Sequence, residues 1–155
     1  MTDDVVFRPA TSEDLAAIVA LFAADDLGGH GDTDDPALRP LYAAALEEIL
    51  ASPVDRLVVG EMEGRVIATG QVTFVRSLPN RGRKRAIVEA VQVDGSLRNR
   101  GVGARLIAHL VELSRSEGAG IVELTSNAAR IDAHRFYDRL GFAHSHVAFK
   151  LKLEP

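Results

Sequence analysis

Three apolar, β-branched segments follow one another in the middle of the chain with no helical segment between them. They span residues 57–62, 65–75 and 86–93, and Glu63-Gly64 between the first two is typical of a tight hairpin turn. After these three segments, the spacing of apolar residues becomes helical from residue 101. Neighbouring strands joined by short turns exclude a regular alternation of strands and helices around a parallel sheet.

Shorter segments on both sides of these strands complete the expected fold. Thr11 and Asp14 have the spacing of a helix capping box, directly before an apolar helical segment. The expected elements are a strand at 5–9, helices at 15–25 and 41–50, the three strands above, a helix at 101–117, a strand at 121–125, a helix at 131–140 and a strand at 143–153. This order, β-α-α-β-β-β-α-β-α-β, predicts an α/β (α+β) fold with a mixed sheet, and the length of 155 residues predicts one domain over 1–155.

The composition excludes several classes of function. Because the chain has no cysteine, it can form neither a disulfide framework, nor a thiolate zinc site, nor an acyl-cysteine intermediate. The longest apolar run, residues 15–24, is about half of the ~20 residues that span a bilayer. We therefore expect a cytoplasmic protein with no membrane partner.

Charge is unevenly distributed along the chain, although the formal net charge is only -4. Residues 1–40 carry nine acidic and two basic side chains, whereas residues 76–105 carry eight basic and two acidic ones. The first segment would attract a cation and the second an anion, although solvated loops such as 81–85 would give the same pattern. No nucleic-acid partner is expected, because the overall balance is acidic and the basic segment contains no aromatic residue.

A glycine-containing turn joins the strand at 86–93 to the next helix, with the sequence Arg98-Asn99-Arg100-Gly101-Val102-Gly103-Ala104. Glycines let the backbone approach a ligand, and unpaired N–H groups at a helix start bind anions, so a pyrophosphate fits this turn. Arg98, Arg100 and Arg105 add positive charge. A simple turn that caps the helix is the alternative. No Gly-Lys-Ser/Thr follows, which argues against a P-loop, and Leu106 occupies the third glycine position of a Rossmann fingerprint.

The motif Arg98-x-x-Gly101-x-Gly103 resembles the acetyl-CoA signature of the GNAT superfamily of N-acyltransferases. Asn127, the segment 132–137 and Leu140-Gly141-Phe142 resemble the second half of that signature. The expected order of elements also agrees with the GNAT fold, which implies a mostly antiparallel sheet. Within the superfamily, residues 123–127 and 132–137 with Ser145-His146 resemble aminoalkylphosphonate N-acetyltransferases and related uncharacterised bacterial proteins, but the N-terminal half does not repeat this likeness.

The resemblance implies acetyl-CoA as co-substrate. The turn would receive the pyrophosphate, the strand edge at 91–93 would pair with the pantetheine arm, and Asn127 would hold the same arm, although a turn or capping role for Asn127 is equally open. The cofactor-binding residues expected on this basis are Val91, Gln92, Val93, Arg98, Asn99, Arg100, Gly101, Val102, Gly103, Ala104, Asn127 and Arg130.

Glu89 is the candidate general base. A primary amine is mostly protonated at neutral pH and must lose a proton before or during attack. Strand alternation would place Glu89 on one face with Ile87, Val91 and Val93, where a carboxylate is costly unless it is paired or functional. The alternative is a salt bridge between Glu89 and Arg85.

Tyr137 is the candidate general acid. Its position matches the one at which many GNAT enzymes use a tyrosine to protonate the departing CoA thiolate. The alternative is a core aromatic, because Tyr137 shares a helical stripe with Ala133, Phe136 and Leu140.

The acidic N-terminal segment lies where GNAT proteins shape the acceptor pocket. Asp25, Asp26 and His30 would suit a cationic amine, and Arg76 would serve an acceptor with a phosphonate group. His144 and His146 share one face of the expected last strand, but no third ligand is evident, so no metal site is predicted.

These observations favour an acetyl-CoA-dependent N-acetyltransferase that transfers an acetyl group directly to a primary amine of a small molecule. The alternative is a non-catalytic acyl-CoA-binding sensor or regulatory module of the same fold. Because dimers are common in the GNAT superfamily, the resemblance also implies a homodimer.

Overall fold

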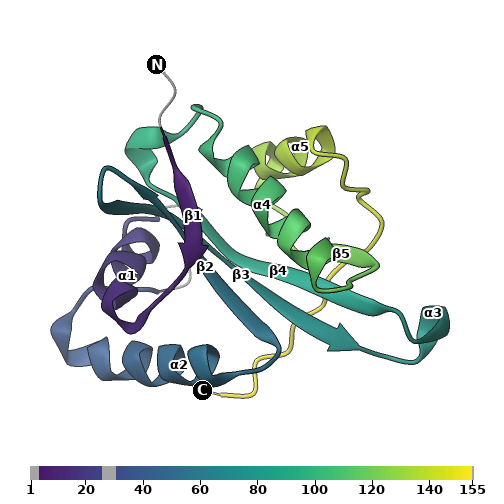
Figure 1. Ribbon diagram of the computed structural model, residues 1–155, viewed down its shortest axis with the longest axis horizontal. Helices are drawn as coiled ribbons and strands as arrows, with labels where there is room; N and C mark the ends of the chain where they lie inside the picture. Colours follow the sequence, from purple (N-terminus) through teal and green to yellow (C-terminus); the bar gives the residue numbers. More distant parts are fainter. Residues whose placement is uncertain (1–3, 26–30, 155) are drawn as a thin grey trace. The chain divides into compact units, whose positions relative to one another are not determined.

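The computed structural model describes residues 4–25 and 31–154 and divides into two compact units, residues 1–123 and 124–155. The first unit contains a sheet whose strands follow one another in the order β1-β2-β3-β4-β5 (Figure 1). These strands are β1 (Val6–Pro9), β2 (Asp55–Met62), β3 (Arg65–Arg76), β4 (Lys84–Val93) and β5 (Ile121–Leu124). The pairs β1–β2, β2–β3 and β3–β4 are antiparallel, as the uninterrupted series of strands predicted.

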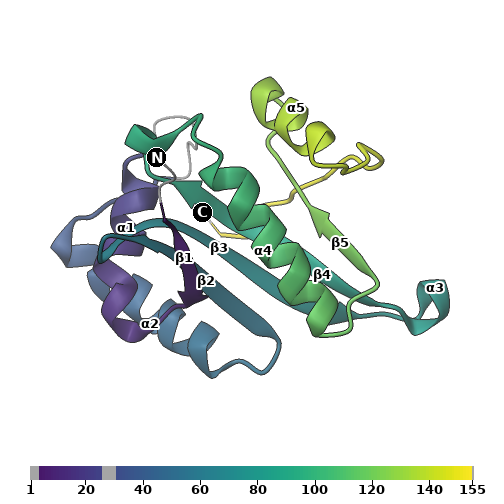
Figure 2. The ribbon, with the colours of Figure 1, turned by 45° about the horizontal axis from the view of Figure 1, so that its top comes forward.

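Helices cover both faces of this sheet (Figure 2). The helices α1 (Leu15–Ala23) and α2 (Arg39–Ala51) lie on one face, and α4 (Val102–Ser116) lies on the other. The short helix α3 (Pro79–Gly82) forms the tip of the β3–β4 hairpin, and three 3-10 turns occupy Ser12–Asp14, Pro36–Leu38 and Gly95–Leu97. The second unit contains α5 (Ile131–Arg139).

The helix α4 packs closely against the centre of the sheet because Gly70 in β3 has no side chain. Leu106 and Leu110 of α4 are fully buried, and a Cβ atom added at Gly70 would lie 2.9 Å from Leu110 Cδ1. A strand residue larger than glycine at this position would push the helix away. The bulk of Leu106, which disfavours a Rossmann fingerprint, is thus part of the core.

The face under α1 and α2 has its own apolar cluster. Ile18 of α1 and Leu46 of α2 pack with Leu57 and Val59 of β2. The spacing of Ile18 and its neighbours predicted this buried helical face.

A buried carboxylate fixes the start of the first helical segment. Asp14 accepts the Thr11 backbone N–H at 2.7 Å, which confirms the predicted capping box. Arg8 in β1 donates to both carboxylate oxygens of Asp14, at 2.8 and 2.9 Å, and to Glu61 of β2 at 2.8 Å. The hydrogen bonds from Arg8 are the largest cause of a lowered pKa of Asp14, against the opposing effect of burial.

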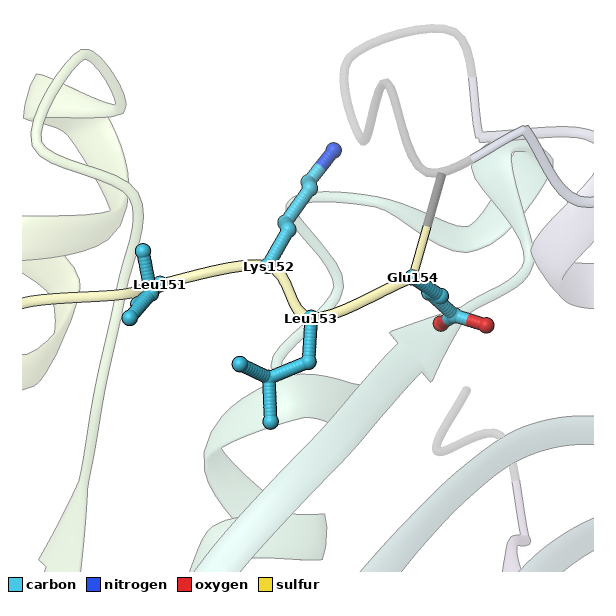
Figure 3. A pocket seen from close by; sticks show the side chains of 4 residues that line it. All are labelled: Leu151, Lys152, Leu153 and Glu154. Carbon is cyan, nitrogen blue, oxygen red and sulfur yellow. The ribbon is translucent and has the colours of Figure 1, made fainter.

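The structure does not form the strand expected at 143–153, because residues 143–154 are neither helix nor strand. The alternating apolar residues of this segment are exposed, with Phe149 at 94%. Figure 3 shows Lys152 and Leu153 pointing to opposite sides of an extended segment. The alternation of apolar and polar residues therefore predicted that neighbouring side chains point to opposite sides. It does not show that a second strand is present to form backbone hydrogen bonds, which a β-strand requires.

The ion pair between Arg8 and Asp14 predicts a pH-dependent contribution to stability. We expect Asp14→Asn to lower the free energy of unfolding by about 1–3 kcal/mol at pH 7. Because the pKa of Asp14 is lowered by folding, its contribution is present above the pKa of an unfolded carboxyl and is lost as pH falls through the folded value. Urea unfolding at pH 7 and pH 3 should show the difference between the two proteins shrinking at the lower pH. The exposed Asp34→Asn is the matched control, and a difference that stays constant with pH would exclude the ion pair as its cause.

Candidate active site

An extra residue in β4 interrupts its pairing with β3 next to the candidate base. Gln71 pairs with Glu89 and Thr69 pairs with Gln92, so two residues of β4, Ala90 and Val91, stand opposite Gly70 alone. Ala90 has a φ of 54°, in the left-handed region. This β-bulge changes the alternation of the strand, and Gln92 lies on the same face as Glu89. The expectation that Val93 shares the face of Glu89 is therefore wrong, because Val93 pairs with Ala68 on the opposite face.

The strand β5 does not accompany β4 beyond the bulge. The strand β5 has four residues and begins beside Lys84, where the Gly120 N–H donates to the Lys84 carbonyl at 2.9 Å. A strand of this length that starts at Lys84 is too short to run beside residues 89–93 of the ten-residue β4. β5 therefore provides no strand partner for the backbone of 89–93.

Glu89 is exposed and does not form the salt bridge that the sequence left open. Arg85 instead donates to Glu123 of β5 at 2.7 Å. The contact of Glu89 is with the Thr73 hydroxyl of β3, at 3.4 Å. The carboxylate is thus close to a polar neighbour and accessible from solvent, as a base acting through water requires.

The turn after β4 presents the start of α4 to an anion. Asp94 accepts the Ser96 backbone N–H at 2.9 Å and shapes the 3-10 turn that leads to Arg98. Asn99 and Gly101 have φ angles of 63° and 78°, and α4 begins directly after Gly101. The first N–H groups of a 15-residue helix have no intrahelical partner and carry the positive end of its dipole. The predicted turn and helix start are thus present, and the binding of a pyrophosphate at Gly101, Val102, Gly103 and Ala104 stays a prediction.

Arg98 and Arg105, two of the arginines near this turn, differ in their surroundings. Arg98 is exposed, and its guanidinium group folds back toward Gly95. Arg105 donates to the Val5 carbonyl at 3.2 Å and lies over the Phe7 ring at 6.0 Å, so it also ties α4 to the N-terminal strand segment. Arg98 is therefore better placed than Arg105 to meet a ligand at the turn.

A cavity of about 320 Å³ lies beside this turn. Ala17, Ala20 and Leu21 of α1 form its apolar wall, and Gln92 and Arg98 from the end of β4 and the turn form its polar side. A second hollow, of about 650 Å³, is bordered only by Leu151, Lys152, Leu153 and Glu154 (Figure 3). Because a single exposed stretch borders that hollow, we assign the site to the first cavity and the adjacent turn.

In the second unit, Asn127 and His134 organise the turn before α5. Asn127 Oδ1 accepts the Ala129 N–H at 2.9 Å, and the Asn127 carbonyl lies 2.9 Å from His134 Nε2. The side-chain oxygen of Asn127 thus has the turn role that the sequence allowed. Its amide N–H groups take no part in that hydrogen bond, so a ligand role for them stays a prediction.

Tyr137 lies in the aromatic part of α5. Its ring contacts Phe136 and Phe142 edge-on, with centroids 5.1 and 5.8 Å apart. Burial raises the pKa of Tyr137, against a smaller opposing effect of the Arg130 charge. The hydroxyl therefore keeps its proton at neutral pH, which a general acid requires.

The predicted acceptor residues do not form one cluster in the described structure. Asp25 follows α1, whereas Asp26 and His30 lie outside the described residues. Arg76 ends β3 and donates to the Gly82 carbonyl at 2.7 Å in the hairpin tip. It lies five residues beyond Gln71, about 17 Å along the strand, so the structure does not bring Arg76 to the bulge.

Sequence reasoning missed polar residues on the face of the sheet that carries Glu89. Thr73 donates to Asp55 Oδ1 at 2.5 Å, and Gln71 lies 3.5 Å from the same oxygen. The alternation of these polar residues with apolar ones in β3 was the sequence signal that could have found them.

Sequence reasoning also missed Tyr42. Its hydroxyl donates to Asp32 at 2.8 Å and ties the acidic segment to α2.

Within 4–25 and 31–154, no group of three or more histidine, aspartate or glutamate side chains is arranged to hold a metal ion. None of the helices in that part of the chain combines the length and apolarity that crossing a membrane requires.

Comparison with known proteins gives a match to the Acetyltransferase (GNAT) family over residues 15–142. A glucosamine 6-phosphate N-acetyltransferase from Trypanosoma brucei brucei is 29% identical over 157 residues, covering 99% of this chain and 100% of that protein. An aminoalkylphosphonate N-acetyltransferase from Salmonella typhimurium is 43% identical over 53 residues, 34% of either chain.

A solved structure is similar over nearly the whole chain. The crystal structure of a transcriptional regulator from Bacillus halodurans C-125 has a TM-score of 0.92 and 32% identity, and the match covers 97% of this chain and 100% of that one. The predicted fold class, a mixed α/β fold with a mostly antiparallel sheet flanked by helices, is confirmed.

The turn geometry predicts a selective role for Arg98 in binding CoA. We expect Arg98→Ala to raise the Kd for CoA by about tenfold or more, because a hydrogen bond to a charged group contributes about 1.5–3 kcal/mol. Calorimetric titration with CoA measures this change. Arg115→Ala, at the opposite end of α4 and exposed, is the matched control. An equal loss in both variants would show that only the general charge of the protein matters.

Proposed function

This chain belongs to the Acetyltransferase (GNAT) family, and on that premise we propose that it is an acetyl-CoA-dependent N-acetyltransferase acting on a primary amine of a small molecule. The observation that carries the proposal is the continuity of one segment. This segment contains, without interruption, Glu89, the bulge, the strand edge at 91–93 that β5 does not accompany, and the glycine-containing turn at 98–104. A long donor with a pyrophosphate at one end and a thioester at the other matches such a segment.

The donor would lie along this segment. The diphosphate would accept hydrogen bonds from the N–H groups of Gly101–Ala104 and from Arg98. The two amides of the pantetheine arm would pair with the backbone of Val91–Val93 as an added strand, since that edge has no neighbour from β5. Asn99 and Arg100 belong to the same proposed segment. For Asn127 and Arg130 of the second unit, a donor-binding role stays a prediction.

Direct transfer explains how acyl chemistry proceeds in a chain without cysteine. Glu89 takes a proton from the ammonium form of the acceptor through a water molecule, and the neutral nitrogen attacks the thioester carbonyl carbon. The carbon–sulfur bond then breaks, and Tyr137 gives its proton to the departing thiolate. The attacking nitrogen, which became positively charged on attack, releases its second proton to solvent and is left as the amide N–H. The products are the N-acetylated amine and CoA, and both side chains regain their starting protonation through solvent.

The acceptor is proposed only as a class. The similar Trypanosoma brucei brucei protein is named for glucosamine 6-phosphate, and the similar Salmonella typhimurium protein is named for aminoalkylphosphonates. Both kinds of molecule combine an amine with a phosphate or phosphonate group. The acidic residues around Asp25 and Asp32 favour the cationic amine end of such a molecule. A single domain over 1–155, a cytoplasmic location and a homodimer stay predictions.

A non-catalytic sensor of acyl-CoA is the second candidate, and one observation favours it. The similar Bacillus halodurans protein is named as a transcriptional regulator. A sensor would bind CoA at the same turn without needing Glu89 or Tyr137. Turnover therefore separates the two candidates, whereas CoA binding does not.

A thiol-release screen tests the proposed enzyme. We expect free CoA thiol to form from acetyl-CoA only in the presence of an amine, tested across amino sugars and their phosphates, aminoalkylphosphonates, polyamines, amino acids and aminoglycosides. Mass spectrometry should show an acetylated product in equal amount. CoA binding without turnover across this screen would favour the sensor instead.

The role of Tyr137 predicts a change in turnover without a change in donor binding. We expect Tyr137→Phe to lower kcat about 100-fold or more, because general acid catalysis contributes about 10²–10⁴-fold. The Kd for acetyl-CoA should stay within about twofold, since the ring and its contacts with Phe136 and Phe142 remain. An unchanged kcat would show that another group protonates the thiolate.

A further inference from the structure

Three neighbouring strands bring two carboxylates to the two sides of one hydroxyl. Asp55 begins β2 and stands directly opposite Thr73 of β3. Glu89 of β4 is displaced along the sheet, since it stands opposite Gln71. The Thr73 Oγ1 atom lies 2.5 Å from Asp55 Oδ1 and 3.4 Å from Glu89 Oε1. The candidate base and a second carboxylate are therefore connected through one side chain.

The single hydrogen of the Thr73 hydroxyl decides how this group is arranged. A hydroxyl donates one hydrogen bond and accepts through its lone pairs. The shorter distance assigns the hydrogen to Asp55, so Thr73 offers a lone pair toward Glu89. An ionised Glu89 cannot use that lone pair, whereas a protonated Glu89 can donate to it.

Asp55 is held in its ionised form, so it keeps the Thr73 hydrogen. Partial burial acts to raise the pKa of Asp55, but hydrogen bonds from Thr73, Ser52 and Gln71, with the charge of Arg56, outweigh it and lower that pKa overall. With Asp55 charged at neutral pH, the Thr73 hydroxyl has one stable orientation. An oriented acceptor next to Glu89 is available before any substrate binds.

We propose that Thr73, oriented by Asp55, is a positioning residue for Glu89 in the transfer reaction, and this rests on the proposed function of Glu89 as base. When Glu89 takes the proton from the acceptor amine, its carboxyl O–H donates to Thr73 Oγ1 while the Thr73 hydroxyl continues to donate to Asp55. The proton stays on Glu89 until solvent removes it after product release. Neither Asp55 nor Thr73 changes its own protonation.

Steady-state kinetics with Thr73 variants tests this role. We expect Thr73→Val to lower kcat about tenfold while the KM for acetyl-CoA stays unchanged, because the donor site lies beyond the bulge. Thr73→Ser, which keeps the hydroxyl, should restore most of kcat. Asp55→Asn should lower kcat to a similar extent, whereas Ser116→Ala, which removes an exposed hydroxyl from the C-terminal end of α4, should leave kcat near the wild-type value.

A double-mutant cycle separates positioning from a general structural effect. In a Glu89→Gln background, Thr73→Val should cause no further loss, because both residues act in the same proton transfer. A further loss of the same factor in that background would overturn the proposal, as would failure of Thr73→Ser to restore kcat in a folded protein. Wild-type kcat in Glu89→Gln alone would instead remove Glu89 as base, and with it the proposed function of this residue. If the wild-type protein shows no turnover with any amine, both the proposed function and the positioning role of Thr73 are overturned.

Discussion

The extra residue that β4 inserts opposite Gly70 is the constraint on which the candidate site depends. In a regular strand, Glu89, Val91 and Val93 would share one face, and the glutamate would be followed by two apolar residues. The bulge changes this order, so Gln92 follows Glu89 onto the same face. It also bends the strand locally, at the position where the short β5 no longer accompanies it. The bulge thus sets which side chains share the face of the candidate base, and the length of β5 sets where the edge of β4 loses its strand partner.

A bulge of this kind carries a conformational cost that the surrounding core must offset. Ala90 adopts a φ of 54°, which costs a residue with a Cβ atom roughly 1–2 kcal/mol. Favourable interactions on both sides of the bulge offset this cost. The Asp94 N–H donates to the Ile67 carbonyl at 2.8 Å and closes the end of the strand, and Leu106 and Leu110 fill the space above Gly70. Strained backbone held in this way by a packed core is typical of functional sites.

The sequence predicted the parts of the site that follow from local rules. The hairpin strands, the Thr11–Asp14 capping box and the turn before α4 each depend on residues close together in the chain, so their patterns were sufficient. The bulge was not predicted, because Ala90 carries no glycine signal and the insertion is defined only by pairing with β3. The contact between Thr73 and Glu89 likewise depends on register. At 143–153 the sequence predicted a strand that the structure does not form. Apolar and polar residues alternate in this segment, but alternation alone does not provide a neighbouring strand to pair with.

We propose above all that one continuous segment, from the bulge to the first turn of α4, binds the acyl donor. Titration of acetyl-CoA into uniformly ¹⁵N-labelled protein, followed by amide chemical shifts, tests it most directly. We expect the largest shifts at Val91–Val93 and Arg98–Ala104, with small shifts in α2 and in the hairpin tip at 79–82. Binding that leaves the amides of 91–93 and 98–104 unchanged while shifting those of another region would contradict it.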